Sequence, residues 1–316
     1  MMLNGRFLYN LLLLIPLLLV SCQAAENIME RAFESPEDVQ IILTGASGPM
    51  QASLWIDGVL HNYGNAYLSG LYADNDTVYV VGTSGILNRG TLWRNNEPER
   101  IPGSGAQVIG LWVENDIPYM VGTSGFLDLT TYWAGDELFT LGDNAVAPTM
   151  FAENGHVYLG GAIGGVSTAG YWIDGEWMPL PQPEAVVADI FVQNGVIYIA
   201  GAYGLSELAG IWIDGELIPL EEPGAELTHI FVEDGIIYLA GIYGPQSVAA
   251  YWADGKRFDL PEDTALIEDM YVKDGIVYLA GSYGLTGQAA FWINGQRYDM
   301  ADPNSDVDHI FVIDAK

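Results

Sequence analysis

The sequence predicts an all-β fold, a seven-bladed β-propeller of four-stranded antiparallel blades, from three features that repeat in phase. The first is a Trp recurring at spacings of 38, 40, 39, 40, 40 and 40 residues: Trp55, Trp93, Trp133, Trp172, Trp212, Trp252 and Trp292. The second is a Gly that ends an apolar run: Gly45, Gly82, Gly122, Gly161, Gly201, Gly241 and Gly281. The third is an aromatic residue in a segment resembling Ile-Phe-Val: Tyr72, Trp112, Phe151, Phe191, Phe231, Tyr271 and Phe311. Three anchors in one phase indicate a true repeat.

Each repeat divides into four short runs, which in the fifth unit are residues 229–233, 236–241, 248–253 and 257–260. These runs are rich in Tyr, Phe, Ile, Val and Trp, and each is too short for a helix of ordinary length, so strands are predicted. Four antiparallel strands in a unit of this length make one propeller blade, and neighbouring blades must stack because one blade cannot bury both of its faces.

The turns between the runs carry a hairpin signal. Asp234-Gly235 joins the first two runs of the fifth unit, and Asp254-Gly255 joins its last two. Asp-Gly and Asn-Gly suit type I′ turns, in which both central residues have positive φ. The same dipeptides recur in most other units, so tight antiparallel connections are expected throughout.

The two ends of the repeat predict how the ring closes. The first unit lacks the Ile-Phe-Val-like run, whereas the last unit consists only of that run, residues 309–313. We therefore expect the C-terminal strand to complete the blade that the N-terminal segment begins. Such a closure removes an open sheet edge that would favour aggregation.

The chain is divided into a leader (1–21), a tether that begins at Cys22 (22–36) and the propeller (37–316). The leader has a positive residue, Arg6, before the apolar stretch 11–20, which is typical of an export signal and short for a membrane span. Cys22 is the only cysteine, so neither an internal disulfide framework nor a cysteine metal cluster is possible.

The segment Leu19-Val20-Ser21-Cys22 resembles the lipobox of bacterial lipoproteins. The resemblance implies cleavage before Cys22 and a lipid on its thiol, which would anchor the exported chain to the cell envelope. Gln23, a residue other than Asp after the cysteine, implies the outer membrane within that family. The alternative is an ordinary signal peptide with an unrelated cysteine.

Charge limits the choice of partners. The chain has 10 Lys+Arg against 41 Asp+Glu, a net charge of −31, and its few cations are scattered without forming a basic patch. This field repels nucleic acid and anionic lipid surfaces, so contact with a membrane is expected through the lipid anchor only. The acidity is interpreted either as a solubility coat or adaptation to salt, or as a feature that attracts cations or a basic partner.

The units also resemble kelch and related propeller repeats over residues 37–316. The resemblance rests on an aromatic-containing strand, a small-Gly strand end such as Ala200-Gly201 or Gly160-Gly161, and an aromatic followed by Trp. It implies a propeller, in which the first strand of each blade lines a central channel. No kelch-type partner is carried over.

One repeated position predicts a candidate ligand site. Two residues before each anchor aromatic, the chain has Gly70, Gly110, Thr149, Asp189, His229, Asp269 and His309. By the propeller resemblance, Asp189, His229, Asp269 and His309 would lie along one arc of the channel mouth. Asp and neutral His can both ligate metals, so a divalent cation is a possible cofactor, although none is required.

Three tyrosines on neighbouring loops, Tyr203, Tyr243 and Tyr283, are candidate contacts of a sugar or peptide. The competing interpretation is structural: Asp or His at a strand start can hydrogen-bond to adjacent backbone and tie blades together, and repeated Tyr can be packing. Both interpretations stay open at this stage, whereas the repeated Trp is expected in the core.

We find no P-loop, dinucleotide-binding glycine pattern, HExxH motif or nucleophile elbow. No catalytic residue is therefore assigned. The sequence favours a non-catalytic binding or scaffold module for a protein or glycan at the cell envelope. The alternatives are an envelope hydrolase or lyase that acts on a glycan at the channel mouth, and a structural envelope protein without a small ligand.

Overall fold

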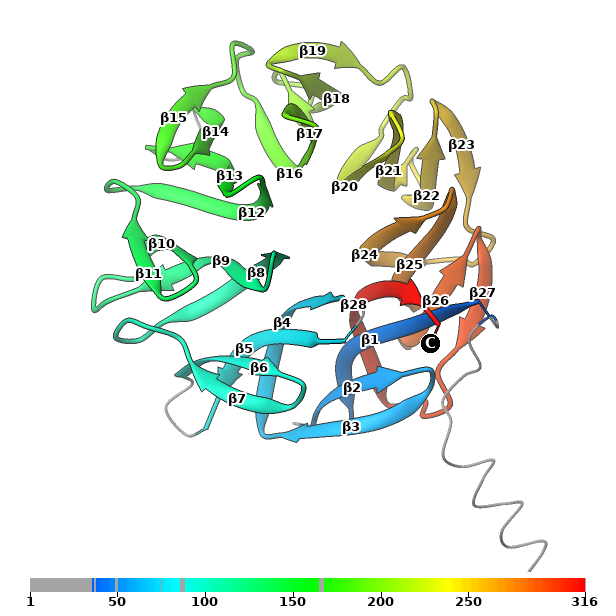
Figure 1. The fold of residues 1–316 in the computed structure, drawn as a ribbon. Coiled ribbons are helices and arrows are strands. Elements are labelled where there is room, and N and C mark those ends of the chain that lie inside the picture. The colour runs from blue at the N-terminus through cyan, green and yellow to red at the C-terminus, as the bar shows by residue number, and fades with distance from the viewer. Residues whose placement is uncertain are drawn as a thin grey trace, which may run out of the picture.

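The computed structural model describes residues 36, 38–48, 51–74, 76–85, 89–164 and 168–315. Their regular structure is entirely β-strand, and it forms seven four-stranded antiparallel sheets arranged in a ring (Figure 1). The predicted seven-bladed propeller is therefore confirmed. The leader, Cys22 and residues 23–35 of the tether lie outside the described residues.

Blade 1 combines strands from both ends of the chain: β28 (Ser305–Asp314), β1 (Val39–Ser47), β2 (Ala52–Ile56) and β3 (Val59–Gly64). Blades 2 and 3 contain β4 (Ala66–Ala73), β5 (Val78–Ser84), β6 (Arg89–Arg94), β7 (Glu97–Arg100), β8 (Gln107–Glu114), β9 (Ile117–Ser124), β10 (Leu129–Ala134) and β11 (Glu137–Thr140). Blades 4 and 5 contain β12 (Ala145–Glu153), β13 (His156–Ile163), β14 (Ala169–Ile173), β15 (Glu176–Pro179), β16 (Val186–Gln193), β17 (Val196–Tyr203), β18 (Leu208–Ile213) and β19 (Glu216–Pro219). Blades 6 and 7 contain β20 (Glu226–Glu233), β21 (Ile236–Tyr243), β22 (Val248–Ala253), β23 (Lys256–Asp259), β24 (Leu266–Lys273), β25 (Ile276–Tyr283), β26 (Gln288–Ile293) and β27 (Gln296–Asp299).

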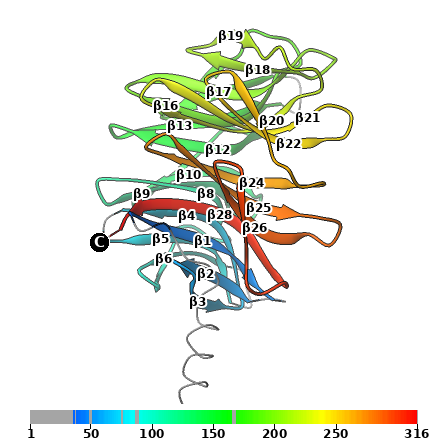
Figure 2. The ribbon, with the colours of Figure 1, turned by 90° about the vertical axis from the view of Figure 1, so that its right-hand side faces the viewer.

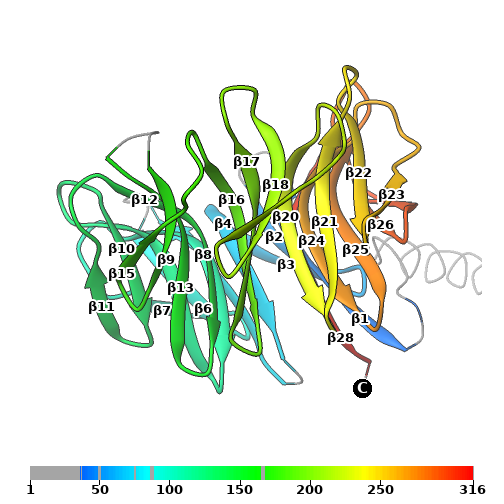
Figure 3. The ribbon, with the colours of Figure 1, turned by 90° about the horizontal axis from the view of Figure 1, so that it is seen from above.

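The C-terminal strand closes the ring as predicted. β28 pairs with β1 from one end of β1 to the other, and Leu43 lies opposite Ile310 in that register. The first strand of every other blade and β28 in blade 1 surround the centre of the ring (Figure 1). Because β1 is antiparallel to β28, its first residue, Val39, lies opposite Asp314 at the end of β28. Figures 2 and 3 show that this end of β28 lies at one face of the disc.

The repeated Trp forms the core between blades, which confirms the expectation. All seven are at most 6 % exposed, and Trp133, Trp212 and Trp292 are fully buried. The turn prediction is also confirmed, since Asp174-Gly175 and the equivalent Asx-Gly pairs have positive φ at both residues. No described helix has the length and apolar character needed to cross a bilayer.

Many of the acidic side chains have structural hydrogen bonds. The Oδ1 atom of Asp174, in the turn between the third and fourth strands, accepts the amide of Val157 at 2.9 Å, and Asp214 accepts the amide of Ile197 at 3.0 Å. At the ends of inner strands, Glu114, Glu153 and Glu233 each accept two amides of the Asx-Gly turn in the next blade, at 2.6–2.9 Å. Part of the acidic composition therefore fastens turns and links neighbouring blades.

A β-bulge near the start of each inner strand explains the second sequence anchor. The pairing of inner strand and second strand shifts there in all seven blades, as between Val187 and Asp189. The backbone of the inner strand then approaches the anchor Gly closely. A Cβ atom built on Gly201 would lie 1.9 Å from the carbonyl oxygen of Val186, and the other six anchor glycines have the same conflict at 1.9–2.1 Å. Glycine is required because a backbone atom occupies the space of a side chain.

Gly201→Ala is accordingly expected to lower the free energy of unfolding by about 1–3 kcal/mol, the usual cost of overpacking. The matched control is Gly142→Ala, because Gly142 has no atom within 4 Å of an added Cβ and no positive φ. Urea denaturation of the two variants measures the difference. Equal stability of the two variants would contradict the close approach.

Candidate functional site

The seven anchor aromatics form a closed ring around the channel. Each side chain contacts the next one, with ring centroids 4.2–5.3 Å apart, and the circle closes between Phe311 and Tyr72 at 4.8 Å. Burial raises the pKa of the Tyr72 hydroxyl to about 12, so this residue stays neutral at physiological pH. The sequence singled out these residues as a repeat marker but did not predict that they meet.

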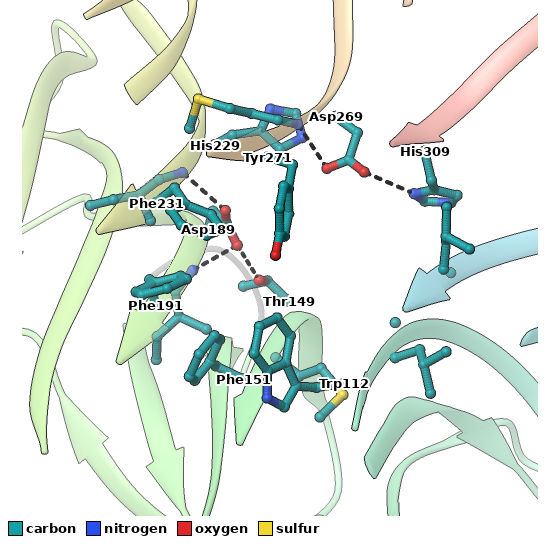
Figure 4. A pocket seen from close by; sticks show the side chains of 18 of the residues that line it. Trp112, Thr149, Phe151, Asp189, Phe191, His229, Phe231, Asp269, Tyr271 and His309 are labelled. Atoms are coloured by element: carbon teal, nitrogen blue, oxygen red, sulfur yellow. Dashed lines mark hydrogen bonds and ion pairs between the residues drawn. The ribbon is translucent and has the colours of Figure 1, made fainter. Parts of the chain in front are cut away.

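A cavity of about 280 Å³ occupies the channel on the side where the inner strands begin. We call this cavity the cup, and the face of the disc onto which it opens the cup face. Its wall comes from the bulges and the residues that follow them, and six of the seven anchor aromatics contribute to its lining. Figure 4 shows the labelled side chains, with Trp112, Phe151, Phe191, Phe231 and Tyr271 grouped near the Asp and His residues.

The cup has two chemically different walls. In blades 2 to 4 the lining is mainly apolar, as at Leu71, Ile109 and Met150. In blades 5, 6, 7 and 1, the structure brings together the four predicted residues Asp189, His229, Asp269 and His309, together with Thr228 and Glu268. A cavity with one apolar and one acidic or imidazole wall suits a ligand that has both an apolar and a polar or cationic part.

Asp189 also links two blades. Its Oδ1 atom accepts hydrogen bonds from the Thr149 hydroxyl at 2.5 Å and from the Ile190 amide at 2.8 Å, and its Oδ2 atom accepts the Ile230 amide of β20 at 3.0 Å. Burial raises the pKa of Asp189, although His229 and these hydrogen bonds oppose that shift. Asp189 thus makes the hydrogen bonds between blades that the structural interpretation of the sequence predicted. It also lines the cup.

Asp269 occupies the equivalent place two blades further on. Its Oδ1 atom accepts the Met270 amide at 2.8 Å, and its Oδ2 atom accepts the Ile310 amide of β28 at 3.0 Å. The same Oδ2 atom lies 3.7 Å from Nδ1 of His309 (Figure 4). Burial disfavours the charged form of His309, but the nearby carboxylate of Asp269, helped by the charges of Asp308 and Glu268, outweighs that effect and raises the pKa of His309.

His229 is more exposed and has no carboxylate partner within ion-pair distance among the described residues. Its Nδ1 atom lies 2.9 Å from the hydroxyl of Thr228. Since its other ring nitrogen makes no hydrogen bond to a described residue, His229 is the cup residue best placed to meet a ligand.

The raised pKa of His309 predicts a pH dependence of stability. A His with a folded-state pKa above its unfolded value of about 6.5 stabilises the fold fully below that pH, and the stabilisation is lost as pH rises through the folded-state pKa. We expect the excess stability of wild type over His309→Gln to be complete below about pH 6.5 and to shrink over the pH range above it. Urea denaturation of both proteins across that range is the measurement, and an excess that grows with pH would contradict the assignment.

The three candidate tyrosines lie outside the cup lining. Tyr243 donates to Asp259 at 3.0 Å and stacks with Arg257 at 3.7 Å, on the outer strands of its own blade. Tyr283 stacks with Arg297 at 4.0 Å, and Tyr203 contacts the edge of Trp212. The structure therefore places these residues on the same face as the cup but further from the channel axis.

No group of three His, Cys, Asp or Glu side chains within the described ranges is placed to hold a metal ion. The Asp269–His309 pair offers two donors, and Asp189 is engaged by three hydrogen bonds. The hypothesis of a divalent cation at the cup therefore rests only on the Asp and His pattern of the sequence.

Comparison with known proteins supports the fold. No protein-family model matches the sequence, and no curated protein sequence matches it. Among solved structures, the acylaminoacyl peptidase of Pyrococcus horikoshii is similar at a TM-score of 0.59 and 13 % identity over 87 % of this chain. This chain covers only 53 % of that peptidase.

The β-propeller domain of the Trilobed protease from Pyrococcus furiosus is similar at a TM-score of 0.58 and 16 % identity, over 87 % of this chain and 99 % of that one. At these identities the likeness concerns the fold alone. That domain is described as having an open velcro topology, whereas β28 and β1 close the present ring.

Proposed function

We propose that this chain is an exported binding module, held at the cell envelope by lipid on Cys22, which uses the cup to recognise a protein or glycan. The observation that carries the proposal is the division of the cup into an apolar wall and an Asp/His wall over a ring of aromatic side chains. The cup is open to solvent and is surrounded by a closed ring of hydrogen-bonded sheets, a scaffold of the kind on which loops commonly carry recognition.

Exposed apolar side chains on the same face support a macromolecular partner. Phe126, Leu205 and Leu285 lie in the loops that follow β9, β17 and β25, and they are 92–99 % exposed. Single exposed apolar residues are common on protein surfaces, but these three share the face of the cup and would add buried apolar area to a complex formed there. The net charge of −31 makes nucleic acid a poor partner.

The binding proposal is tested with a glycan array and a peptide library on the chain from Gln23 onward. His229→Ala should weaken binding of any selected ligand about tenfold or more, which corresponds to one lost polar contact of about 1.4 kcal/mol. The control is His156→Ala, because His156 is exposed at the start of β13 on the opposite face, where it pairs with Asp174. Equal affinity of the two variants would place the ligand outside the cup.

A second candidate is a glycan hydrolase or lyase at the same cup, favoured by the Asp269–His309 pair and the raised pKa of His309. Such a pair could transfer a proton to or from a bound sugar. Turnover that His229→Ala and Asp269→Ala both abolish, in proteins that keep their fold, would replace the binding proposal by this one.

A further inference from the structure

Two arginines stand apart from the other cations of this acidic protein. Most described cations pair with acids: Arg94 with Glu99, Arg257 with Glu222 and Asp259, Lys273 with Asp314, and Arg297 with Glu262 and Asp299. Lys256 lies over the ring of Phe258. Arg89 and Arg100 have neither an acidic nor an aromatic partner in the part of the chain that the structure describes.

The hairpin of blade 2 brings these two arginines together. Thr91 of β6 lies opposite Arg100 of β7, so Arg89, two residues before Thr91, is the diagonal neighbour of Arg100 on the same face of the sheet. Diagonal neighbours in an antiparallel pair have Cβ atoms about 7–8 Å apart, within reach of long side chains. Two like charges are thus held close together with no acid between them.

Both arginines line one cavity of about 260 Å³, together with Gly90, Ile101 and residues 103–106. None of the described residues that line it is acidic. The loop has positive φ at Gly103 and Gly105, and within the described residues the amides of Gly103, Ser104 and Gly105 make no hydrogen bond. Free amides of a glycine-rich turn, beside guanidinium groups, are the donors that proteins use to bind oxyanions.

The register shows that an arginine at this position occurs in blade 2 alone. The residues at the position of Arg100 in the other six blades are Asn62, Thr140, Pro179, Pro219, Asp259 and Asp299. A general solubility role would not place two cations that lack an acidic partner among the described residues side by side in one repeat, in a chain with a net charge of −31.

We propose that Arg89, Arg100 and the loop of residues 101–106 form a binding site for an oxyanion, such as a phosphate, a sulfate or a carboxylate. Each guanidinium group can donate two parallel hydrogen bonds to such a group, and the loop amides complete its coordination. The site does not depend on a ligand in the cup.

The oxyanion site opens on the cup face. Arg89 begins β6 and Arg100 ends β7, and the loop leads directly into β8. Ala106 lines the oxyanion site and Ile109 lines the cup, so about 10 Å of extended chain separates the two cavities. An anionic group carried by a peptide or glycan could therefore occupy this site while another part of the same molecule enters the cup.

The test measures the labelling of arginines by phenylglyoxal on the full-length chain in nonionic detergent, with modified peptides identified by mass spectrometry. Inorganic phosphate, sulfate and glucuronate are added separately at constant ionic strength, so that their order of potency distinguishes phosphoryl, sulfate and carboxylate sources. At an anion concentration about ten times the dissociation constant, labelling of Arg89 and Arg100 should slow about tenfold, because the free fraction falls by that factor. Labelling of Arg94 should not change.

Two variants distinguish specific binding at this cavity from a general effect of positive charge. Arg100→Gln should abolish the protection of Arg89, whereas Arg94→Gln, which removes one charge from the same blade but outside the cavity, should preserve it. Protection by none of the three anions overturns the proposal. So does equal protection of Arg94, or protection of Arg89 that survives Arg100→Gln. Circular dichroism of each variant confirms that the β-fold is retained before labelling is compared.

Discussion

A chain that ends at residue 304, before β28, is expected to lose its cooperative fold. The deletion removes the inner strand of blade 1, including the buried side chains of Val307, Ile310, Phe311 and Val312. Burial of four such side chains contributes about 6–12 kcal/mol, which is comparable with the whole net stability of a domain, about 5–15 kcal/mol. The deletion also opens the aromatic ring between Tyr271 and Tyr72.

Thermal denaturation and size-exclusion chromatography of the shortened chain measure this loss. We expect aggregation and no sharp unfolding transition, because β1 then presents an unpaired edge along its whole length. A synthetic peptide of residues 303–316, added during refolding, should restore a soluble monomer. A shortened chain that melts at the temperature of the intact one would show that closure adds nothing.

Trp212→Ala is expected to cost about 3–5 kcal/mol of stability, the usual range for truncating a buried Trp. Trp212 is fully buried between blades 4 and 5, and its indole N–H donates at 2.5 Å to Gln182 in the loop that joins these blades. The variant should still bind any ligand of the cup at low temperature, since Trp212 does not line that cavity. Urea denaturation monitored by circular dichroism measures the loss in the free energy of unfolding.

A finer comparison uses Trp252, which is buried but whose indole N–H has no hydrogen-bond partner among the residues that the structure describes. Replacement of Trp by Phe removes the indole N–H at either site. Trp252→Phe should therefore be the milder change, because it removes an unpaired buried donor, whereas Trp212→Phe leaves Gln182 without its donor. Greater destabilisation by Trp252→Phe would contradict this hydrogen-bond assignment.

The architecture could be predicted because its determinants are local. Each hairpin is specified by an Asx-Gly pair with positive φ, as at Asp234-Gly235, and the spacing of the Trp anchors follows from the length of one blade. Closure of the ring by the C-terminal strand was predicted because the first unit lacks the Ile-Phe-Val-like run and the last unit consists only of it. None of these inferences needed knowledge of contacts between blades.

The site was predicted only in part because it depends on contacts between blades. The alignment of repeats brought Asp189, His229, Asp269 and His309 to one cavity, but the hydrogen bonds from Asp189 and Asp269 to the next inner strand depend on the bulge. The repeat pattern also does not show how far a residue lies from the channel axis. Tyr243 is near Asp259 and Arg257 rather than near the channel because it lies where β21 meets the outer strands.

The cavity lined by Arg89 and Arg100 was not predicted from the sequence, because it also depends on contacts that the sequence alone does not show. Arg89 and Arg100 are 11 positions apart in a chain whose cations look scattered, and a basic patch was not expected. A hairpin whose register places Thr91 opposite Arg100 brings them together. Pairing register, not composition, decides which charges share a cavity.

The direction of β1 has a consequence for how the protein would be displayed. Val39 begins β1 at the face where β28 ends, opposite the face on which the cup opens. If Cys22 carries lipid, as the sequence predicts, and the chain runs directly from this anchor to Val39, the face opposite the cup would lie toward the membrane. Both cavities would then point away from the bilayer, toward molecules that arrive from the aqueous compartment rather than toward neighbours embedded in the lipid.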